Sequence, residues 1–347
     1  MARPKRILLL GWQHTIGSGL ATIPVIQALR EHFGAGTEFW LLTRAAPPGA
    51  SHPFELLVTW VDLRGVFFLP PLRDPVSWTR LVWNVRKLDF DQSVYVDLSC
   101  PKPRVIKILT LFSWLAALGR PLGLPTTSVP MVAPKGESAR RLANLVADGI
   151  SVSINPIMPT MVPPAAANVD EWLASRRRPG FGLIAICPGA RSPANHWPLR
   201  HFAVLGSRLI QWGGYDIVIC GGPEERSAGL ALVTGWGEGI TAAGIFSLSE
   251  TAHLLARCDL AIGLDTGTSH LAAAVGTPVI VLQGGRCVPG LWDPLGVKIS
   301  ILRNQVPCVG CGVSRCPLII HPCMRGITPQ AVWCEVERVL SSRFHRP

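Results

Sequence analysis

The sequence has no long apolar segment and comparatively few charged residues. Its longest mostly apolar run, residues 108–118, has 11 residues, whereas a membrane-spanning helix needs about 18. Charged residues make up 16% of the 347 positions and hydrophobic residues 48%. This balance excludes a disordered chain, a collagen-like repeat and a small disulfide scaffold, and the length is that of two domains of ordinary size.

A secretion signal is also missing. The basic residues at the start are followed by only four apolar residues, 7–10, and by no small-residue cleavage site. We therefore expect a cytoplasmic protein whose ten cysteines are thiols or metal ligands rather than a disulfide framework.

Acidic residues are scarce relative to basic ones. Asp and Glu number 22 against 33 Lys and Arg, which gives a formal net charge of +11, and only six of the basic residues are Lys. The basic excess is seven in residues 1–150 and four in residues 151–347. An Arg-rich surface suits phosphates, anionic lipid headgroups or nucleic acid, and the total charge does not choose among them.

Short apolar runs alternate with helical patterns through most of the sequence, which is typical of βαβ units and a parallel sheet. We predict strands at residues 6–11, 37–42, 66–69, 93–98, 181–187, 216–220, 259–264 and 278–283. We predict helices at residues 20–33, 53–60, 76–87, 104–118, 169–175, 198–212, 249–257 and 268–275, with two more after Pro223 and Thr328. The proline-rich stretch 151–180 interrupts the alternation as a linker would. Two consecutive α/β domains, residues 1–165 and 166–330, and a terminal segment over 331–347 follow from this pattern.

One loop combines a strand end, a glycine turn and a helix start. Residues 265–274 read Asp-Thr-Gly-Thr-Ser-His-Leu-Ala-Ala-Ala. Free N–H groups at such a helix start can bind an anion, and in a doubly wound domain this point lies at the sheet edge where ligands bind. The alternative is an ordinary capped helix in which Asp265 satisfies the N–H groups and His270 has no role.

Two further strand ends carry polar glycine turns. Residues 187–198 hold Gly189, Arg191 and Asn195, and the guanidinium of Arg191 offers planar donors suited to phosphate. Residues 221–226 hold Glu224, which could bind ribose hydroxyls or only complement a helix dipole. No complete dinucleotide fingerprint and no Gly-x-x-x-x-Gly-Lys-Ser/Thr loop is present, which disfavours the usual nicotinamide and ATP enzymes.

Four cysteines, Cys308, Cys311, Cys316 and Cys323, lie within 16 residues. Four thiolates can close a tetrahedral zinc or iron site, and the first pair has a suitable spacing. The later spacings are irregular for a zinc ribbon, so a reduced loop and local disulfides remain open beside a structural metal site.

Four stretches, in order, resemble glycosyltransferase family 9, the ADP-heptose:lipopolysaccharide heptosyltransferases. They are residues 6–29, 188–198 with Pro-Gly-Ala and Trp-Pro, 265–278, and 308–332. The resemblance covers nearly the whole chain and implies the GT-B fold, an α/β architecture of two Rossmann-like doubly wound domains facing a central cleft. It also implies that the first domain binds the acceptor, the second binds the donor, and the terminal helix crosses back onto the first.

The resemblance implies an inverting transfer of a heptose or related sugar from an ADP-sugar to the lipopolysaccharide inner core. The lipid A-core acceptor would lie at the inner-membrane surface, with the enzyme cytoplasmic or peripheral to that membrane, and neither a nucleic acid nor a catalytic cofactor is implied. Donor-binding positions carried over are Gly189, Arg191, Asn195, Glu224, Phe246, Asp265, Thr266, Gly267, Thr268 and His270. Glu224 would bind the ribose and Phe246 would lie near the adenine.

The sequence departs from the family pattern at two positions. The family usually has an aspartate, proposed as the catalytic base, where this chain has Ser18, and a phosphate-binding lysine where it has Asn195. His14 or Asp97 could supply the base, and Arg191 the cation. The alternatives are a member with a different acceptor, a catalytically silent nucleotide-sugar or glycan-binding protein, and a nucleic-acid-binding protein, for which no recognition motif is present.

Overall fold

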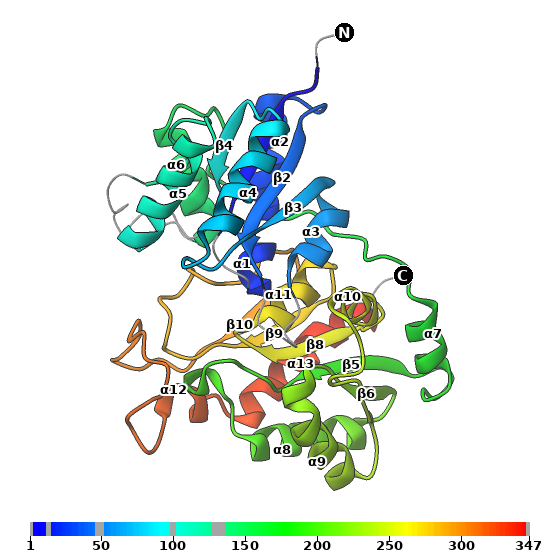
Figure 1. Cartoon of the computed structure of the whole chain (residues 1–347). Helices are drawn as coiled ribbons and strands as arrows, with labels where there is room; N and C mark the ends of the chain where they lie inside the picture. Colours follow the sequence, from blue (N-terminus) through cyan, green and yellow to red (C-terminus); the bar gives the residue numbers. More distant parts are fainter. Residues whose placement is uncertain (1–2, 12–14, 46–51, 98–101, 126–135, 345–347) are drawn as a thin grey trace. The chain divides into compact units, whose positions relative to one another are not determined.

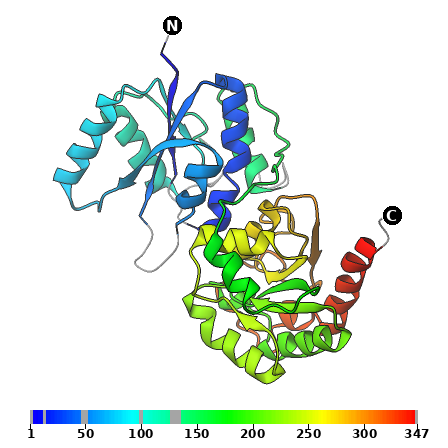
Figure 2. The same cartoon turned by 90° about the vertical axis from the view of Figure 1, so that its right-hand side faces the viewer.

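The computed structural model of the chain describes residues 3–11, 15–45, 52–97, 102–125 and 136–344. They form two compact units, Met1–Met158 and Pro159–Pro347, and the division falls within the proline-rich stretch. In each unit helices cover both faces of a sheet (Figures 1 and 2). The predicted pair of doubly wound α/β architectures is therefore confirmed.

The first unit contains a four-stranded parallel sheet in the order β3-β2-β1-β4. Its strands are β1 (Arg6–Leu10), β2 (Glu38–Arg44), β3 (Leu63–Leu69) and β4 (Gln92–Tyr95). The central strand β1 is apolar because it is packed on both faces, and its residues 7–10 are fully buried.

Six helices accompany this sheet in the described residues: α1 (Ile16–Leu20), α2 (Ile23–Phe33), α3 (Phe54–Trp60), α4 (Pro75–Lys87), α5 (Pro103–Leu115) and α6 (Glu137–Ala147). Helices α4 and α5 share one apolar core with Leu8 and Leu10 of β1, so they lie on the same face of the sheet. Helix α6, which the sequence reasoning missed, packs against α2.

The second unit contains a six-stranded parallel sheet in the order β10-β9-β8-β5-β6-β7. Its strands are β5 (Gly182–Cys187), β6 (Tyr215–Ile219), β7 (Ile240–Thr241), β8 (Leu260–Leu264), β9 (Val279–Leu282) and β10 (Ile299–Leu302). The four inner strands match the predictions. The two missed strands, β7 and β10, are the sheet edges, where short and half-buried segments leave a weak apolar pattern.

The helices of the second unit are α7 (Ala167–Ala174), α8 (Leu199–Trp212), α9 (Arg226–Trp236), α10 (Leu248–Ala256), α11 (Gly267–Ala274), α12 (Pro322–Arg325) and α13 (Pro329–Phe344). The sequence also suggests Ser249 as the N-cap of α10, and this expectation is wrong. Ser247 caps this helix in a reciprocal capping box with Glu250, because buried Leu248 belongs to its first turn.

The last helix, α13, begins as predicted, with the Thr328 hydroxyl accepting a hydrogen bond from the Ala331 N–H at 3.2 Å. Its buried side chains, Val332, Trp333, Val336 and Leu340, join the apolar core of the second unit, where α13 packs against α8 and β9. That it also returns to the first unit stays a prediction.

Candidate functional site

Most of the predicted donor-binding residues follow three neighbouring strands of the second sheet. The loops after β8, β5 and β6 leave the same edge because these strands are parallel and adjacent. Asp265 to His270 follow β8, Gly189 to Asn195 follow β5, and Glu224 follows β6. This carboxyl edge is where doubly wound sheets bind ligands.

The start of α11 carries no side-chain cap. Thr266 occupies the N-cap position with extended backbone, but its side chain accepts no hydrogen bond from the first turn. The Ser269 hydroxyl instead donates a hydrogen bond to the Leu264 carbonyl at 2.6 Å, which ties the helix start to the end of β8. The interpretation of this segment as an ordinary capped helix is therefore wrong, and the first-turn N–H groups remain available for an anion.

Buried polar atoms without a partner gather at this edge. Among the described residues, the Asn195 Oδ1, the Thr266 Oγ1 and both amide atoms of Gln283 are buried and make no hydrogen bond. The Asn195 Nδ2 donates to the Asp265 carbonyl at 3.3 Å, which holds two of the loops together. A buried polar group without a partner costs about 1–3 kcal/mol, so such a group calls for a ligand or water.

Two ionisable groups at this edge have shifted pKa values. Burial raises the pKa of Asp265 to about 6, although the nearby Gln283 amide and the positive charges of Arg286 and Arg303 oppose the shift. Burial lowers the pKa of His270 to about 4, so its imidazole is neutral at pH 7. A neutral imidazole can donate or accept one hydrogen bond per nitrogen without adding charge.

A pocket of about 630 Å³ opens beside the loops after β5 and β6. Its lining includes Gly189, His196, Glu224, Arg315 and Arg325. This volume lies within the range of small-molecule sites. Asp265 and the start of α11 do not line this pocket, so the structure places the predicted donor residues in two groups along one edge.

Glu225, which the sequence reasoning missed, is the more enclosed of the two neighbouring glutamates. Its Oε2 accepts a hydrogen bond from the Gly222 N–H at 2.7 Å, and burial raises the pKa of its carboxyl group. A Cβ at Gly189 would lie 2.3 Å from the Glu225 Oε1, so a larger residue at position 189 would displace the Glu225 side chain. Glu224 is exposed on the pocket wall.

Two other predicted donor residues lie apart from these groups. Arg191 is exposed and has no hydrogen bond or ion pair within the described chain. Phe246 lies before α10, and its ring packs edge-on against Trp172 of α7 at 5.3 Å between centroids. Arg191 is thus free to reach an anion, whereas one side of Phe246 is occupied.

In the first unit, two of the predicted catalytic residues meet. The Ser18 hydroxyl donates to the Asp97 Oδ1 at 3.0 Å. The guanidinium of Arg141, from α6, donates to the Ser18 Oγ at 3.2 Å and lies 4.0 Å from the Asp97 Oδ1. His14 lies outside the described residues.

Arg141 is nearly fully buried, and its remaining donors are also used. They reach the Thr22 Oγ1 at 2.8 Å and the carbonyls of Ser18 and Val96, both at 3.1 Å. Its Nε lies 3.5 Å from a carboxylate oxygen of Glu137. Sequence reasoning missed Arg141 together with α6, although the spacing of Ala139, Leu142 and Leu145 was a usable helical signal.

The cysteine cluster does not assemble as a ligand set. In the described part of the chain, no three His, Cys, Asp or Glu side chains lie close enough to hold a metal ion. Cys308, Cys311, Cys316 and Cys323 are free thiols, of which the last alone is buried. The disulfide alternative is therefore wrong for these four, and the metal site stays a prediction.

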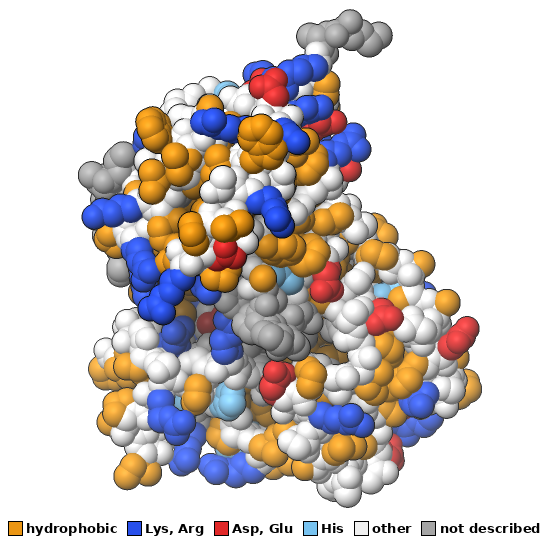
Figure 3. All heavy atoms as spheres, viewed as in Figure 1, with side chains coloured by type: hydrophobic (Ala, Val, Ile, Leu, Met, Phe, Trp, Pro, Cys, Tyr) orange, Lys and Arg blue, Asp and Glu red, His pale blue; other side chains and the backbone are white. Residues whose placement is uncertain are grey.

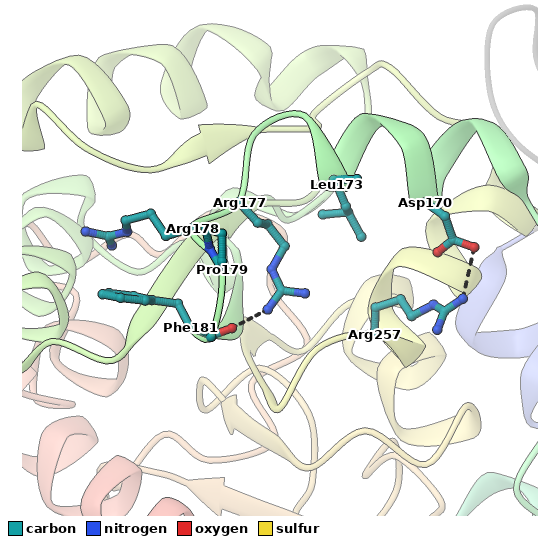
Figure 4. Close-up of a pocket in the computed structure, with 9 residues that line it drawn as sticks. Asp170, Leu173, Arg177, Arg178, Pro179, Phe181 and Arg257 are labelled. Atoms are coloured by element: carbon teal, nitrogen blue, oxygen red, sulfur yellow. Dashed lines mark hydrogen bonds and ion pairs between the residues drawn. The ribbon is translucent and has the colours of Figure 1, made fainter.

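A second pocket, of about 500 Å³, lies at the opposite, amino-terminal edge of the second sheet and contains none of the predicted residues. Figure 4 shows Arg257 paired with Asp170, and Arg177 turned toward the carbonyl of Phe181.

No described helix is long and apolar enough to cross a membrane.

Comparison with known proteins gives a consistent result. The profile described as "Glycosyltransferase family 9 (heptosyltransferase)" matches residues 138–319, more than half of the chain. Lipopolysaccharide heptosyltransferase 2 of Salmonella typhimurium is 31% identical over 180 residues, which are 50% of this chain and 50% of that protein. The chain thus spans about half the length of this curated relative.

Solved structures match over a longer range. The Escherichia coli ADP-heptose lipopolysaccharide heptosyltransferase II matches with a TM-score of 0.74 at 20% identity, over 97% of this chain and 99% of that one. A family 9 glycosyl transferase from Veillonella parvula matches with a TM-score of 0.75 at 18% identity, over 99% of both chains. These likenesses show that the whole chain shares the fold of these enzymes.

Proposed function

Because the chain belongs to glycosyltransferase family 9, we propose that it transfers a heptose, or a related sugar, from an ADP-sugar to the lipopolysaccharide inner core with inversion. Its fold is GT-B, with two Rossmann-like domains, and the resemblance seen in the sequence is confirmed. The observation that carries the proposal is the uncapped start of α11 beside the unpartnered atoms of Asn195, Thr266 and Gln283.

In this proposal the second unit binds the donor. The N–H groups of Gly267 and Thr268 and the dipole of α11 hold the diphosphate, on which negative charge develops as the sugar leaves. The neutral imidazole of His270 and the amide of Asn195 add hydrogen bonds, and the unpaired guanidinium of Arg191 supplies the cation. No catalytic metal takes part. Asp265 would repel a diphosphate, so we assign it to the sugar hydroxyls.

The nucleoside lies along the other group of residues. It occupies the pocket that Gly189 and Glu225 line, and the exposed carboxylate of Glu224 accepts hydrogen bonds from the ribose hydroxyls. Phe246 offers its free side to the adenine.

The first unit binds the acceptor and supplies the base. The new bond forms between the acceptor oxygen and the anomeric carbon while the bond to the diphosphate breaks. Ser18 stands at the family's base position and already donates to Asp97. We assign the proton to Asp97, either directly or through the Ser18 hydroxyl, which passes on its own proton as it accepts another.

The acceptor is a lipid A-core molecule at the inner-membrane surface, and the enzyme acts from the cytoplasm as a peripheral protein. The basic excess in residues 1–150 favours an acceptor that carries phosphates. Nucleic acid is not part of the proposal.

The test is transfer by the purified full chain. ADP-heptose is supplied with a heptose-deficient core acceptor, ADP release is followed by chromatography, and the product is identified by mass spectrometry. We expect a heptose-extended core, lost in Asp265→Asn. Binding of ADP without transfer from any ADP-sugar would instead support the silent binding protein, the second candidate, which the replacements at Ser18 and Asn195 favour.

A further inference from the structure

The outward surfaces of α4 and α5 expose large apolar side chains. Trp114 is 70% exposed, Val76 69%, Trp83 60% and Leu111 58%. Tryptophan is seldom this exposed in a water-soluble fold, and neighbouring exposed apolar side chains usually mark a binding surface.

The same surfaces are basic and contain no acid. Helices α4 and α5 hold five cations, Arg80, Arg86, Lys87, Arg104 and Lys107, and neither helix contains Asp or Glu. Helical spacing aligns four exposed residues of each helix in one row. We call the two rows the α4–α5 surface, which consists of Val76, Arg80, Trp83, Lys87, Arg104, Lys107, Leu111 and Trp114.

The two rows belong to one continuous surface of the first unit. The helices lie side by side, since the Arg86 Nε donates to the Leu115 carbonyl at 2.9 Å and the rings of Trp78 and Phe112 are 6.3 Å apart. Where Figure 1 draws α4 and α5, Figure 3 shows hydrophobic and basic side chains side by side.

Nearby acidic side chains are already engaged. Asp74 accepts a hydrogen bond from the Ser77 N–H at 3.0 Å as the cap of α4, and its carboxylate also interacts electrostatically with Arg80. Asp89 and Asp91, which follow α4, both pair with Arg3. The Lys87 ammonium lies 5.2 Å from the Trp83 ring centre. This contact is with an uncharged ring, so Lys87 keeps its positive charge. Asp74 therefore offsets part of the charge of Arg80, whereas Lys87, Arg104 and Lys107 form no ion pair among the described residues.

We propose that the α4–α5 surface docks on a lipid bilayer that contains anionic lipids. Tryptophan with Lys and Arg, and without acids, is the composition of membrane-interface helices: rings enter the headgroup region while cations stay at its surface. Anionic headgroups complement the four cations of this surface, Arg80, Lys87, Arg104 and Lys107. Docking deepens the proposed function, because it would bring the enzyme to its lipid acceptor. Its biological role therefore rests on that proposed function.

Vesicle flotation with the full chain tests the proposal without donor or acceptor. We expect binding to phosphatidylethanolamine vesicles that contain phosphatidylglycerol, and little binding to pure phosphatidylcholine. Trp83→Ser and Trp114→Ser should each lower the partition coefficient between vesicle and water by on the order of tenfold. Arg80→Gln and Lys107→Gln should lower it by about fivefold each, and high salt should remove this part of the binding.

A matched control carries the same kinds of change on exposed helix positions of the second unit. Val204→Ser, Leu230→Ser, Arg200→Gln and Arg226→Gln remove two apolar and two basic side chains from α8 and α9. This variant should bind vesicles like the original chain. Circular dichroism and the unfolding midpoint of every variant show that the fold is retained.

Equal vesicle binding by the α4–α5 variants and the original chain would overturn the proposal. So would a dimer, detected by sedimentation, that the same substitutions dissociate while vesicles are not bound. Transfer to a deacylated, water-soluble core acceptor separates the two claims. Unchanged soluble transfer with lost vesicle binding supports the surface, whereas vesicle binding without any transfer refutes the proposed function alone.

Discussion

Two sites in the molecule, one in each unit, differ in how their buried polar groups are satisfied. At the carboxyl edge of the second sheet, atoms of Asn195, Thr266 and Gln283 are buried without a partner. In the first unit, Arg141 is buried with its donors directed at Ser18, Thr22, Val96 and Glu137.

The difference separates a place that awaits a ligand from one that is already complete. Unpaired buried groups lower stability until a ligand binds, whereas a fully paired cluster stabilises the fold and fixes the positions of its members. Binding residues are therefore sought in the second unit, and positioning residues in the first.

We expect the largest effect on stability from the removal of Arg141. Arg141→Met should lower the free energy of unfolding by about 3–5 kcal/mol, because it leaves buried carbonyls and carboxylates unpaired. Urea denaturation measures the change. Arg104→Met, on exposed α5, is the control and should change the value by less than about 0.5 kcal/mol. Equal effects of the two substitutions would show that the buried cluster adds no more to the free energy of unfolding than an exposed arginine does.

The Ser18–Asp97 pair distinguishes positioning from chemistry. Asp97→Asn should reduce kcat by about a hundredfold or more if this carboxylate takes the acceptor proton. KM for the donor should stay the same, because the proposed donor site lies in the other unit. Steady-state ADP release measures both constants. A normal kcat in Asp97→Asn would leave Asp97 a purely structural role.

Two threonines provide a direct contrast. Thr266→Val removes a buried hydroxyl without a partner and should stabilise the ligand-free chain by about 1 kcal/mol while weakening ADP binding. Thr22→Val removes a hydroxyl that bonds Arg141 at 2.8 Å and the Ser18 carbonyl at 3.0 Å. It should destabilise the chain by about 1–3 kcal/mol. Thermal unfolding with and without ADP compares the two, and shifts of the same sign would contradict the contrast.

The pH dependence of stability should show two opposing contributions from the carboxyl edge of the second sheet. The pKa of Asp265 is raised to about 6, so its contribution falls as the pH rises from about 4 to about 6. The pKa of His270 is lowered to about 4, so its contribution rises between about pH 4 and 6.5.

Single variants separate these contributions. Compared with the original chain, Asp265→Asn should gain stability as the pH rises toward 6, and His270→Gln should lose it. Urea denaturation at several pH values between 4 and 7 measures both. Parallel curves for all three proteins would mean that neither group is shifted.

Metal removal should have the smallest effect. Since the proposed catalysis uses amide groups and cations of the chain, treatment with a strong chelator should leave the transfer rate unchanged. Elemental analysis before and after treatment tests the predicted structural zinc or iron at Cys308, Cys311, Cys316 and Cys323. A rate lost on chelation and restored by one metal would contradict the metal-free chemistry.

Sequence reasoning found the inner strands of both sheets because a strand buried on two faces is a continuous apolar run. It missed β7 and β10 at the edges of the second sheet, and it missed α6. Glycine turns at strand ends placed the residues predicted to bind the donor after β5, β6 and β8, and the structure confirms this position along one edge. Which of them would be buried, paired or exposed did not follow, and Glu225 and Gln283 were overlooked for that reason.

Local periodicity and turn chemistry in the sequence were enough to establish two parallel α/β units and to place the glycine loops at strand ends, because these properties depend on residues a few positions apart. Only the tertiary structure joined Ser18 and Asp97 to Arg141, brought Asn195 and Gln283 to Asp265 before α11, and set α4 beside α5 with Trp83 and Trp114 outward. Such contacts link segments far apart in the chain, and the packing of helices on sheets, rather than any local pattern, decides which side chains meet.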